Sequence, residues 1–125
     1  MLEVRASELG GRGLFATEAI AADVLLMSAP VLLIPPGERA ALEETIVDHY
    51  VYEWDDDGTA ALVLGVSSMC NHASDPNAYL WLVPDDLRAE LWSTRRIAVD
   101  EEVTVSYRAS GDPDAPLWFD VVGPD

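Results

Sequence analysis

The side chains that could do conventional chemistry are few in this chain and poorly placed for it. Cys70 and His72 are two residues apart, so on an extended segment they would share a face and could form a thiol–imidazole pair. No third group is evident to orient the imidazole, and a lone cysteine is usually a small buried hydrophobe. One Cys and two His cannot make a standard closed zinc site. The carboxylates of Asp55–Asp57 lack the alternating ligand spacing of a calcium loop, so the sequence predicts neither a cysteine nucleophile nor a metal centre.

Three short segments carry a more specific pattern. They are GRGLFA at Gly11–Ala16, NHASDPN at Asn71–Asn77 and DEEVTVSY at Asp100–Tyr107. An Asn-His pair followed four residues later by Pro-Asn is rare by chance, whereas a Gly-x-Gly turn is a weak signal by itself. In this order and at these separations, the segments resemble the SET domain of protein lysine methyltransferases, over the chain from about Leu2 to Tyr107.

The resemblance implies an S-adenosylmethionine site and the residues that would form it. The backbone of Gly11, Arg12 and Gly13 would contact the cofactor, and glycine suits this place because it lets a ligand approach the main chain closely. Asn71 and His72 would supply side-chain and backbone hydrogen bonds to the amino-acid end and the adenine of the cofactor. For His72 the alternative is a core histidine with a protein partner, and its role in the family is partly architectural.

The resemblance also implies tyrosines around a methyl-transfer channel. Tyr107 would lie at the mouth of this channel, beside the cofactor, although a core aromatic at a strand end is the alternative. A second channel tyrosine must come from elsewhere, because Met27–Pro30 lacks the Tyr-x-Gly element of many SET domains. The candidates are Tyr50, Tyr52 and Tyr79, of which we favour Tyr52.

The tail, residues 108–125, is expected to close the channel. It has no cysteine-rich zinc segment, and its large aromatic residues are Trp118 and Phe119. We expect Trp118 to contribute to the cofactor site; simple hydrophobic capping is the alternative for both aromatics.

Short apolar runs between dense turn residues predict the elements that must position these segments. Glu38–His49 is the one expected helix, with apolar Leu42, Ile46 and Val47 at helical spacing. Pro76 and Asn77 would belong to a knot-like crossing, typical of SET domains, through which the C-terminal strand passes. We therefore expect one mainly β domain over residues 1–125, a SET-domain fold of the β-clip type with a pseudoknotted C-terminal strand and a core at residues 2–107. The expected strands are Leu2–Arg5, Leu14–Ala16, Val24–Met27, Val31–Ile34, Val103–Tyr107 and the hairpins Tyr50–Trp54 with Ala60–Leu64 and Ala78–Val83 with Leu87–Ser93.

Composition limits the class of partner. The net charge of −16, from 23 acidic residues and 7 arginines, excludes a general nucleic-acid binder and argues against docking on anionic membranes. An acidic surface favours cationic partners, although salt adaptation would give the same composition. The single cysteine and the absence of a secretory signal in MLEVRASELG predict a cytoplasmic protein.

Together these features predict an S-adenosylmethionine-dependent protein lysine N-methyltransferase that acts on basic proteins or peptides. A homodimer is possible. Two other functions stay open: a SET-fold binding module that has lost turnover, and an acidic interaction protein that masks a basic partner.

Overall fold

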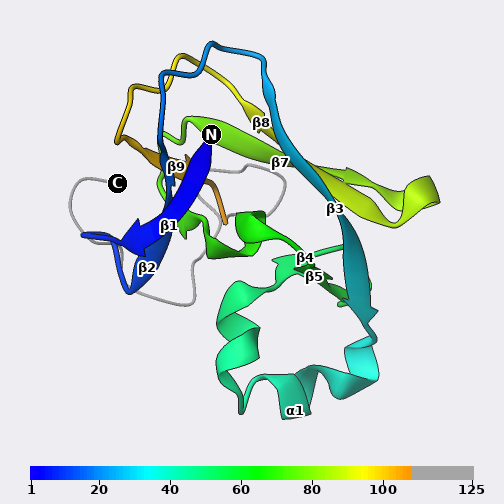
Figure 1. Ribbon diagram of the computed structural model, residues 1–125. Helices are drawn as coiled ribbons and strands as arrows, with labels where there is room; N and C mark the ends of the chain where they lie inside the picture. Colours follow the sequence, from blue (N-terminus) through cyan, green and yellow to red (C-terminus); the bar gives the residue numbers. More distant parts are fainter. Residues whose placement is uncertain (108–125) are drawn as a thin grey trace.

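Two β-sheets form the framework of the computed structural model, which describes residues 1–107 (Figure 1). The first sheet has the strand order β1-β2-β9-β6, and the second has the order β4-β5-β3-β8-β7. The strands of the first sheet are β1 (Leu2–Ala6), β2 (Arg12–Ala16), β6 (Asn71–His72) and β9 (Glu102–Val105). Those of the second are β3 (Leu25–Ile34), β4 (Tyr52–Glu53), β5 (Ala60–Val63), β7 (Ala78–Val83) and β8 (Arg88–Ser93).

The main core joins the two sheets. Leu14 of β2, Leu91 of β8 and Val103 of β9 are fully buried in one cluster. Burial of side chains of this size contributes roughly 1.5–3 kcal/mol each. This cluster therefore fixes β2 and β9, which carry two of the three sequence segments, against the second sheet.

Both expected hairpins are confirmed. β4 and β5 pair antiparallel across the turn that contains Gly58, which has a φ of +90°. β7 and β8 pair antiparallel from Ala78 opposite Ser93 to Val83 opposite Arg88.

The two strands expected around Pro30 form the single strand β3. Its first half pairs with β8 up to Pro30 opposite Arg88, and its second half pairs with β5 from Val31 opposite Val63. The proline lies where β3 changes partner, and its carbonyl accepts from Leu64 N at 3.0 Å. A missing N–H is tolerated at such a position, so Pro30 does not end the strand.

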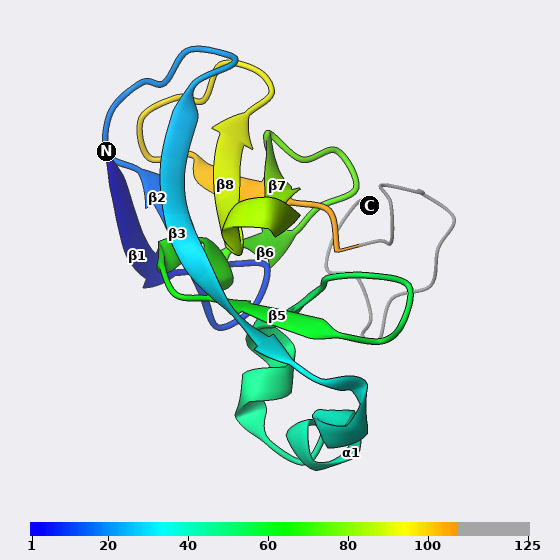
Figure 2. The same ribbon diagram turned by 90° about the vertical axis from the view of Figure 1, so that its right-hand side faces the viewer.

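The one expected helix is present, but it is shorter than the predicted range Glu38–His49. The α-helix α1 spans only Arg39–Leu42, between the 3₁₀ turns Pro36–Glu38 and Ile46–Tyr50. Ile46 is 70% exposed and Val47 38% exposed, so the apolar face has no surface to pack against, and most helix stability comes from such packing. Figures 1 and 2 both show this segment at one end of the molecule, beyond the end of β3. None of the helices within residues 1–107 has the length and apolarity needed to cross a membrane.

The last strand ends earlier than expected. β9 stops at Val105, so Tyr107 follows the strand. Thr104, in the middle of β9, is buried. β6 runs parallel to β9, with Asn71 opposite Thr104. The strand pair brings the second and third sequence segments side by side; Trp118, Phe119 and the rest of the tail lie outside the described residues.

Candidate functional site

The three sequence segments meet at one end of the first sheet. The turn between β1 and β2 contains Gly10 with a φ of +149° and Gly11 with a φ of +48°, a backbone conformation that favours glycine. Gly11 and Arg12 are exposed, and a Cβ atom added to Gly11 would have no neighbour within 4 Å. A ligand can therefore approach the backbone at Gly11.

Asn71 connects this turn to the rest of the sheet through one end of its side chain. Its Nδ2 donates to the carbonyl oxygens of Gly10 at 3.3 Å and Arg12 at 3.0 Å, and to Glu102 Oε2 at 2.8 Å. Within residues 1–107, the Asn71 side chain makes its hydrogen bonds through Nδ2, and Oδ1 accepts none. The side chain is half-buried, and its carbonyl oxygen is available to a hydrogen-bond donor on a ligand.

Gly13 is buried under the contact between Asn71 and Glu102. A Cβ atom at this position would collide with Glu102 Oε2 and lie 2.9 Å from Asn71 Nδ2. Any larger residue here would therefore have to displace the Glu102 carboxylate, so glycine suits the protein's own packing. This differs from the reason given by the sequence, which was space for the cofactor.

His72 is buried and positions the main chain of Tyr107. Its Nδ1 accepts from Tyr107 N at 3.0 Å, and the two rings lie 5.6 Å apart between centroids. Because Nδ1 is an acceptor here, the neutral ring carries its proton on Nε2. The His72 side chain thus serves the architecture of the site.

Tyr52 and Tyr107 form an edge-to-face pair, with ring centroids 6.1 Å apart and an interplanar angle of 83°. The Tyr107 hydroxyl donates to the carbonyl oxygen of Cys70, and the Tyr52 hydroxyl donates to that of Ser67 at 2.8 Å. Burial raises the pKa of both phenols, that of Tyr52 well above its ordinary value. Both hydroxyls therefore stay protonated at neutral and moderately alkaline pH.

A cavity of about 350 Å³ opens beside the two tyrosines. Of the three candidates for a second channel tyrosine, Tyr52 lines it together with Tyr107, whereas Tyr50 does not. Tyr79 of β7 pairs with Trp92, is 42% exposed and does not line the cavity. The other lining residues are Arg39, Glu43, Asp48, His49, Val51 and Glu53.

The remaining titratable groups argue against other chemistry at this place. Burial, followed by the charge of Glu102, raises the pKa of the Cys70 thiol to about 12, so it is not a thiolate nucleophile at neutral pH. Within residues 1–107, no group of three or more His, Cys, Asp or Glu side chains is arranged to hold a metal ion.

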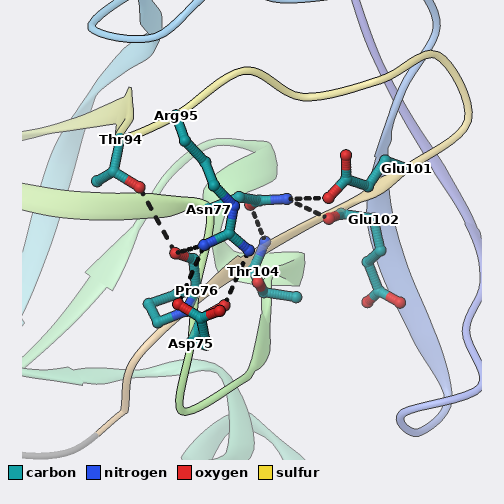
Figure 3. Close-up of polar contacts among 8 residues, drawn as sticks. All are labelled: Asp75, Pro76, Asn77, Thr94, Arg95, Glu101, Glu102 and Thr104. Carbon is teal, nitrogen blue, oxygen red and sulfur yellow. Dashed lines mark hydrogen bonds and ion pairs between the residues drawn. The ribbon is translucent and has the colours of Figure 1, made fainter.

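Asn77 supports the site from the other side of β9. It is buried; its Oδ1 accepts from Thr104 N at 2.9 Å, and its Nδ2 donates to the Glu102 carbonyl at 2.8 Å and to Glu101 Oε2 at 3.2 Å (Figure 3). An amide side chain here takes the place of a neighbouring strand. The sequence assigned Asn77 to the crossing but did not predict these partners.

A comparison of the sequence with models of protein families shows to which family the chain belongs. The family model described as SET domain matches residues 11–108. The chain belongs to the SET-domain family. The resemblance noted in the three segments is thereby confirmed, and so is the predicted fold class.

Relatives of this SET-domain chain are named as histone-lysine N-methyltransferases. A Schizosaccharomyces pombe enzyme named as H3 lysine-37 specific is 35% identical over 120 residues, which cover 95% of this chain and 77% of the relative. A Saccharomyces cerevisiae enzyme named as H3 lysine-36 specific is 41% identical over 44 residues, which cover 34% of this chain and 6% of the relative.

Solved structures agree with the SET-domain fold. A Plasmodium falciparum protein described as a candidate histone methyltransferase superposes with a TM-score of 0.64 at 26% identity, covering 87% of this chain and 94% of the other. A humanized mutant of Chaetomium thermophilum Polycomb Repressive Complex 2 gives a TM-score of 0.70 at 22% identity, covering 86% of this chain and 15% of the other. The second likeness shows the fold alone.

Proposed function

We propose that this SET-domain chain is an S-adenosylmethionine-dependent protein lysine N-methyltransferase. The observation that carries the proposal is the place of Tyr107. Its main-chain N–H is bonded to His72, in the segment expected to hold the cofactor, and its ring lines the cavity beside Tyr52. One residue thus joins a cofactor site to a side-chain cavity, as methyl transfer between two bound molecules requires.

The residues at the glycine turn fit the amino-acid end of S-adenosylmethionine. Asn71 Oδ1 can accept from an ammonium group, and the exposed turn at Gly11 leaves room for close approach. Asn71, the backbone of Gly11–Gly13 and the backbone of His72 would hold the cofactor. When bound, the cofactor supplies a methyl group activated by a sulfonium.

The two phenols can orient the attacking amine. Each hydroxyl proton is directed to a main-chain carbonyl, of Cys70 for Tyr107 and of Ser67 for Tyr52. The phenol oxygens therefore act as hydrogen-bond acceptors toward an amine N–H. Only a neutral lysine amine is nucleophilic, so the enzyme's task is to align that amine rather than to provide a strong base.

The cavity lining supports a basic substrate. Glu43, Asp48 and Glu53 place carboxylates around it, and Arg39 is held by Glu53 at 3.1 Å and by the Gly58 carbonyl at 3.0 Å. With a net charge of −16, the chain attracts a lysine-containing peptide from a distance. The names of the relatives make histone H3 the first substrate to test.

The test is methyl transfer from labelled S-adenosylmethionine to histone H3 and to a mixture of basic proteins, read by mass spectrometry. The chain contains no lysine, so its own side chains contribute no background of lysine methylation. We expect methylated lysine on the added protein. Cofactor binding without transfer to any of them would favour a binding module, and no cofactor binding would favour an acidic interaction protein.

A further inference from the structure

The Glu102 side chain lies where the three sequence segments meet. Its Oε1 accepts from Ser7 Oγ at 2.6 Å, and its Oε2 accepts from Asn71 Nδ2 at 2.8 Å. Ser7 Oγ in turn accepts from Leu9 N at 3.0 Å. Both carboxylate oxygens are therefore used to tie the turn after β1 to β6.

The main chain and the side chain of Glu102 have separate partners. The carbonyl oxygen accepts from Asn77 Nδ2 at 2.8 Å and belongs to the contact between Asn77 and β9. Figure 3 shows the carboxylate pointing away from Asn77. A substitution of the side chain therefore leaves the Asn77 bond in place.

The orientation of the Asn71 amide depends on what surrounds its Nδ2. With Nδ2 placed as observed, two protons face two carbonyls and one carboxylate. A flipped amide would set Oδ1 against three acceptors, which is repulsive. Glu102 is the one charged acceptor of the three, and charge-assisted hydrogen bonds are the stronger ones.

We infer that Glu102 is a positioning residue of the cofactor site, which holds the Asn71 amide so that Oδ1 faces the amino-acid end of S-adenosylmethionine. This inference rests on the proposed function. Donation from Nδ2 to a carboxylate also polarises the amide, which makes Oδ1 a better acceptor for an ammonium group. The buried Gly13 is the counterpart of this arrangement, because any side chain there would displace Glu102.

Two ligands separate a positioning role from a purely structural one. S-adenosylhomocysteine carries the amino-acid end, whereas 5′-methylthioadenosine has the same nucleoside and lacks that end. Glu102→Met keeps the length of the side chain and removes both acceptors. We expect it to weaken S-adenosylhomocysteine binding roughly tenfold or more, and 5′-methylthioadenosine binding by less than about twofold. Calorimetry and ligand-detected NMR give the two affinities.

The neighbouring carboxylate offers a matched control. Glu101 accepts from Asn77 Nδ2 at 3.2 Å and from Ala98 N at 2.9 Å, and it has no hydrogen bond to the glycine turn. Glu101→Gln removes the same charge from the same motif. We expect it to change the two ligand affinities by the same small factor, so that their ratio stays as in the parent chain.

A double-mutant cycle tests whether Glu102 acts through Asn71. In the Asn71→Ala background, Glu102→Met should cause no further loss of S-adenosylhomocysteine affinity. The inference would be overturned if the two substitutions reduced the affinity for S-adenosylhomocysteine independently, so that their effects multiplied. It would also be overturned if Glu102→Met weakened the binding of both ligands equally or weakened neither. If Glu102→Met does not fold, Glu102→Asp draws the carboxylate back from Asn71 and must show the same selective loss. Failure of the proposed function is distinct: the parent chain would bind neither ligand, or Asn71→Ala would bind S-adenosylhomocysteine unchanged.

Discussion

At the scale of single residues, Tyr107 acts through two separate groups. Its main-chain N–H is fixed by His72, and its hydroxyl is fixed by the carbonyl of Cys70. Tyr107→Phe removes only the second contact and keeps the ring beside Tyr52. We expect a folded protein with unchanged cofactor affinity and a loss of roughly 10²-fold or more in kcat, because misplaced reacting atoms are costly. Tyr79→Phe, which removes a hydroxyl outside the cavity, is the control. Equal turnover of Tyr107→Phe and the parent would make Tyr107 a packing residue.

The raised pKa values of the two phenols set the expected pH dependence. Free lysine has a pKa of about 10.4, so the neutral fraction of the substrate amine rises tenfold per pH unit below that value. Burial raises the pKa of Tyr52 and Tyr107 above the ordinary tyrosine value, so neither phenol loses its proton first. We expect kcat/KM to rise from about pH 7 to about pH 9 without a falling limb. A decline of kcat/KM within that range would contradict this prediction. If the decline were preserved in Tyr107→Phe and absent in Tyr52→Phe, Tyr52 would be the phenol that loses its proton.

Gly13 gives a prediction about stability. Gly13→Ala places a methyl group against the Glu102 carboxylate, so we expect the free energy of unfolding to fall by about 1–3 kcal/mol. Adding Glu102→Ala should recover most of this loss, because it removes the colliding group, without restoring the affinity for S-adenosylhomocysteine. Gly37→Ala, where an added Cβ has no neighbour within 4 Å, is the matched control for urea unfolding. Equal stability of the two single variants would show that the turn relaxes freely.

At the scale of elements, the sequence predicts what local chemistry determines. Turn residues around Gly58 and Pro84 predict the two hairpins because their backbone preferences act over a few residues. The length of the one helix was overpredicted, because helical spacing does not reveal whether a neighbour exists to cover Ile46 and Val47. β6 is two residues long and is a strand only because it pairs with β9, so no local sequence pattern predicts it.

In the candidate site, too, some features could be predicted from the sequence and others could not. Asn71, His72 and Tyr107 stand in recognisable motifs, so their part in the site could be predicted from the sequence. The partners of Glu102 could not, because Ser7 and Asn71 lie 95 and 31 residues away along the chain. Such contacts depend on strand order and register, which one sequence does not contain. The pair of acidic residues before Val103 marks the family motif, but it does not indicate which partners Glu102 would have.

The contribution of Asn77 to holding β9 can be tested by substitution. Asn77→Ala leaves the buried N–H of Thr104 without its acceptor and removes the donor to the Glu102 carbonyl. We expect a loss of about 2–4 kcal/mol in the free energy of unfolding, measured by urea denaturation, because buried polar groups without partners are costly. Asn71→Ala, at a half-buried position, should reduce the free energy of unfolding clearly less than Asn77→Ala does, and should reduce the cofactor affinity more. The reverse order would mean that β9 is held mainly by its pairing with β2.

At the scale of the whole molecule, the net charge of −16 predicts how the enzyme finds its substrate. Long-range attraction between an acidic protein and a basic peptide is screened as the ionic strength rises. We therefore expect KM for a basic peptide to increase steadily between about 0.05 M and about 0.5 M salt, while kcat changes little. Steady-state kinetics at fixed, saturating S-adenosylmethionine measure both.

The salt effect should be traceable to the cavity. Glu43→Gln and Asp48→Asn each remove one carboxylate from its lining, whereas Asp23→Asn removes the same charge from an exposed turn residue that does not line it. We expect the first two to raise KM at low salt and to flatten its salt dependence, and the third to leave the slope close to that of the parent. We expect all three variants to keep kcat, because each retains both phenols. Equal effects of the three variants would assign the attraction to the overall charge, and a parent KM that does not change with salt would assign the acidity to solubility or salt adaptation.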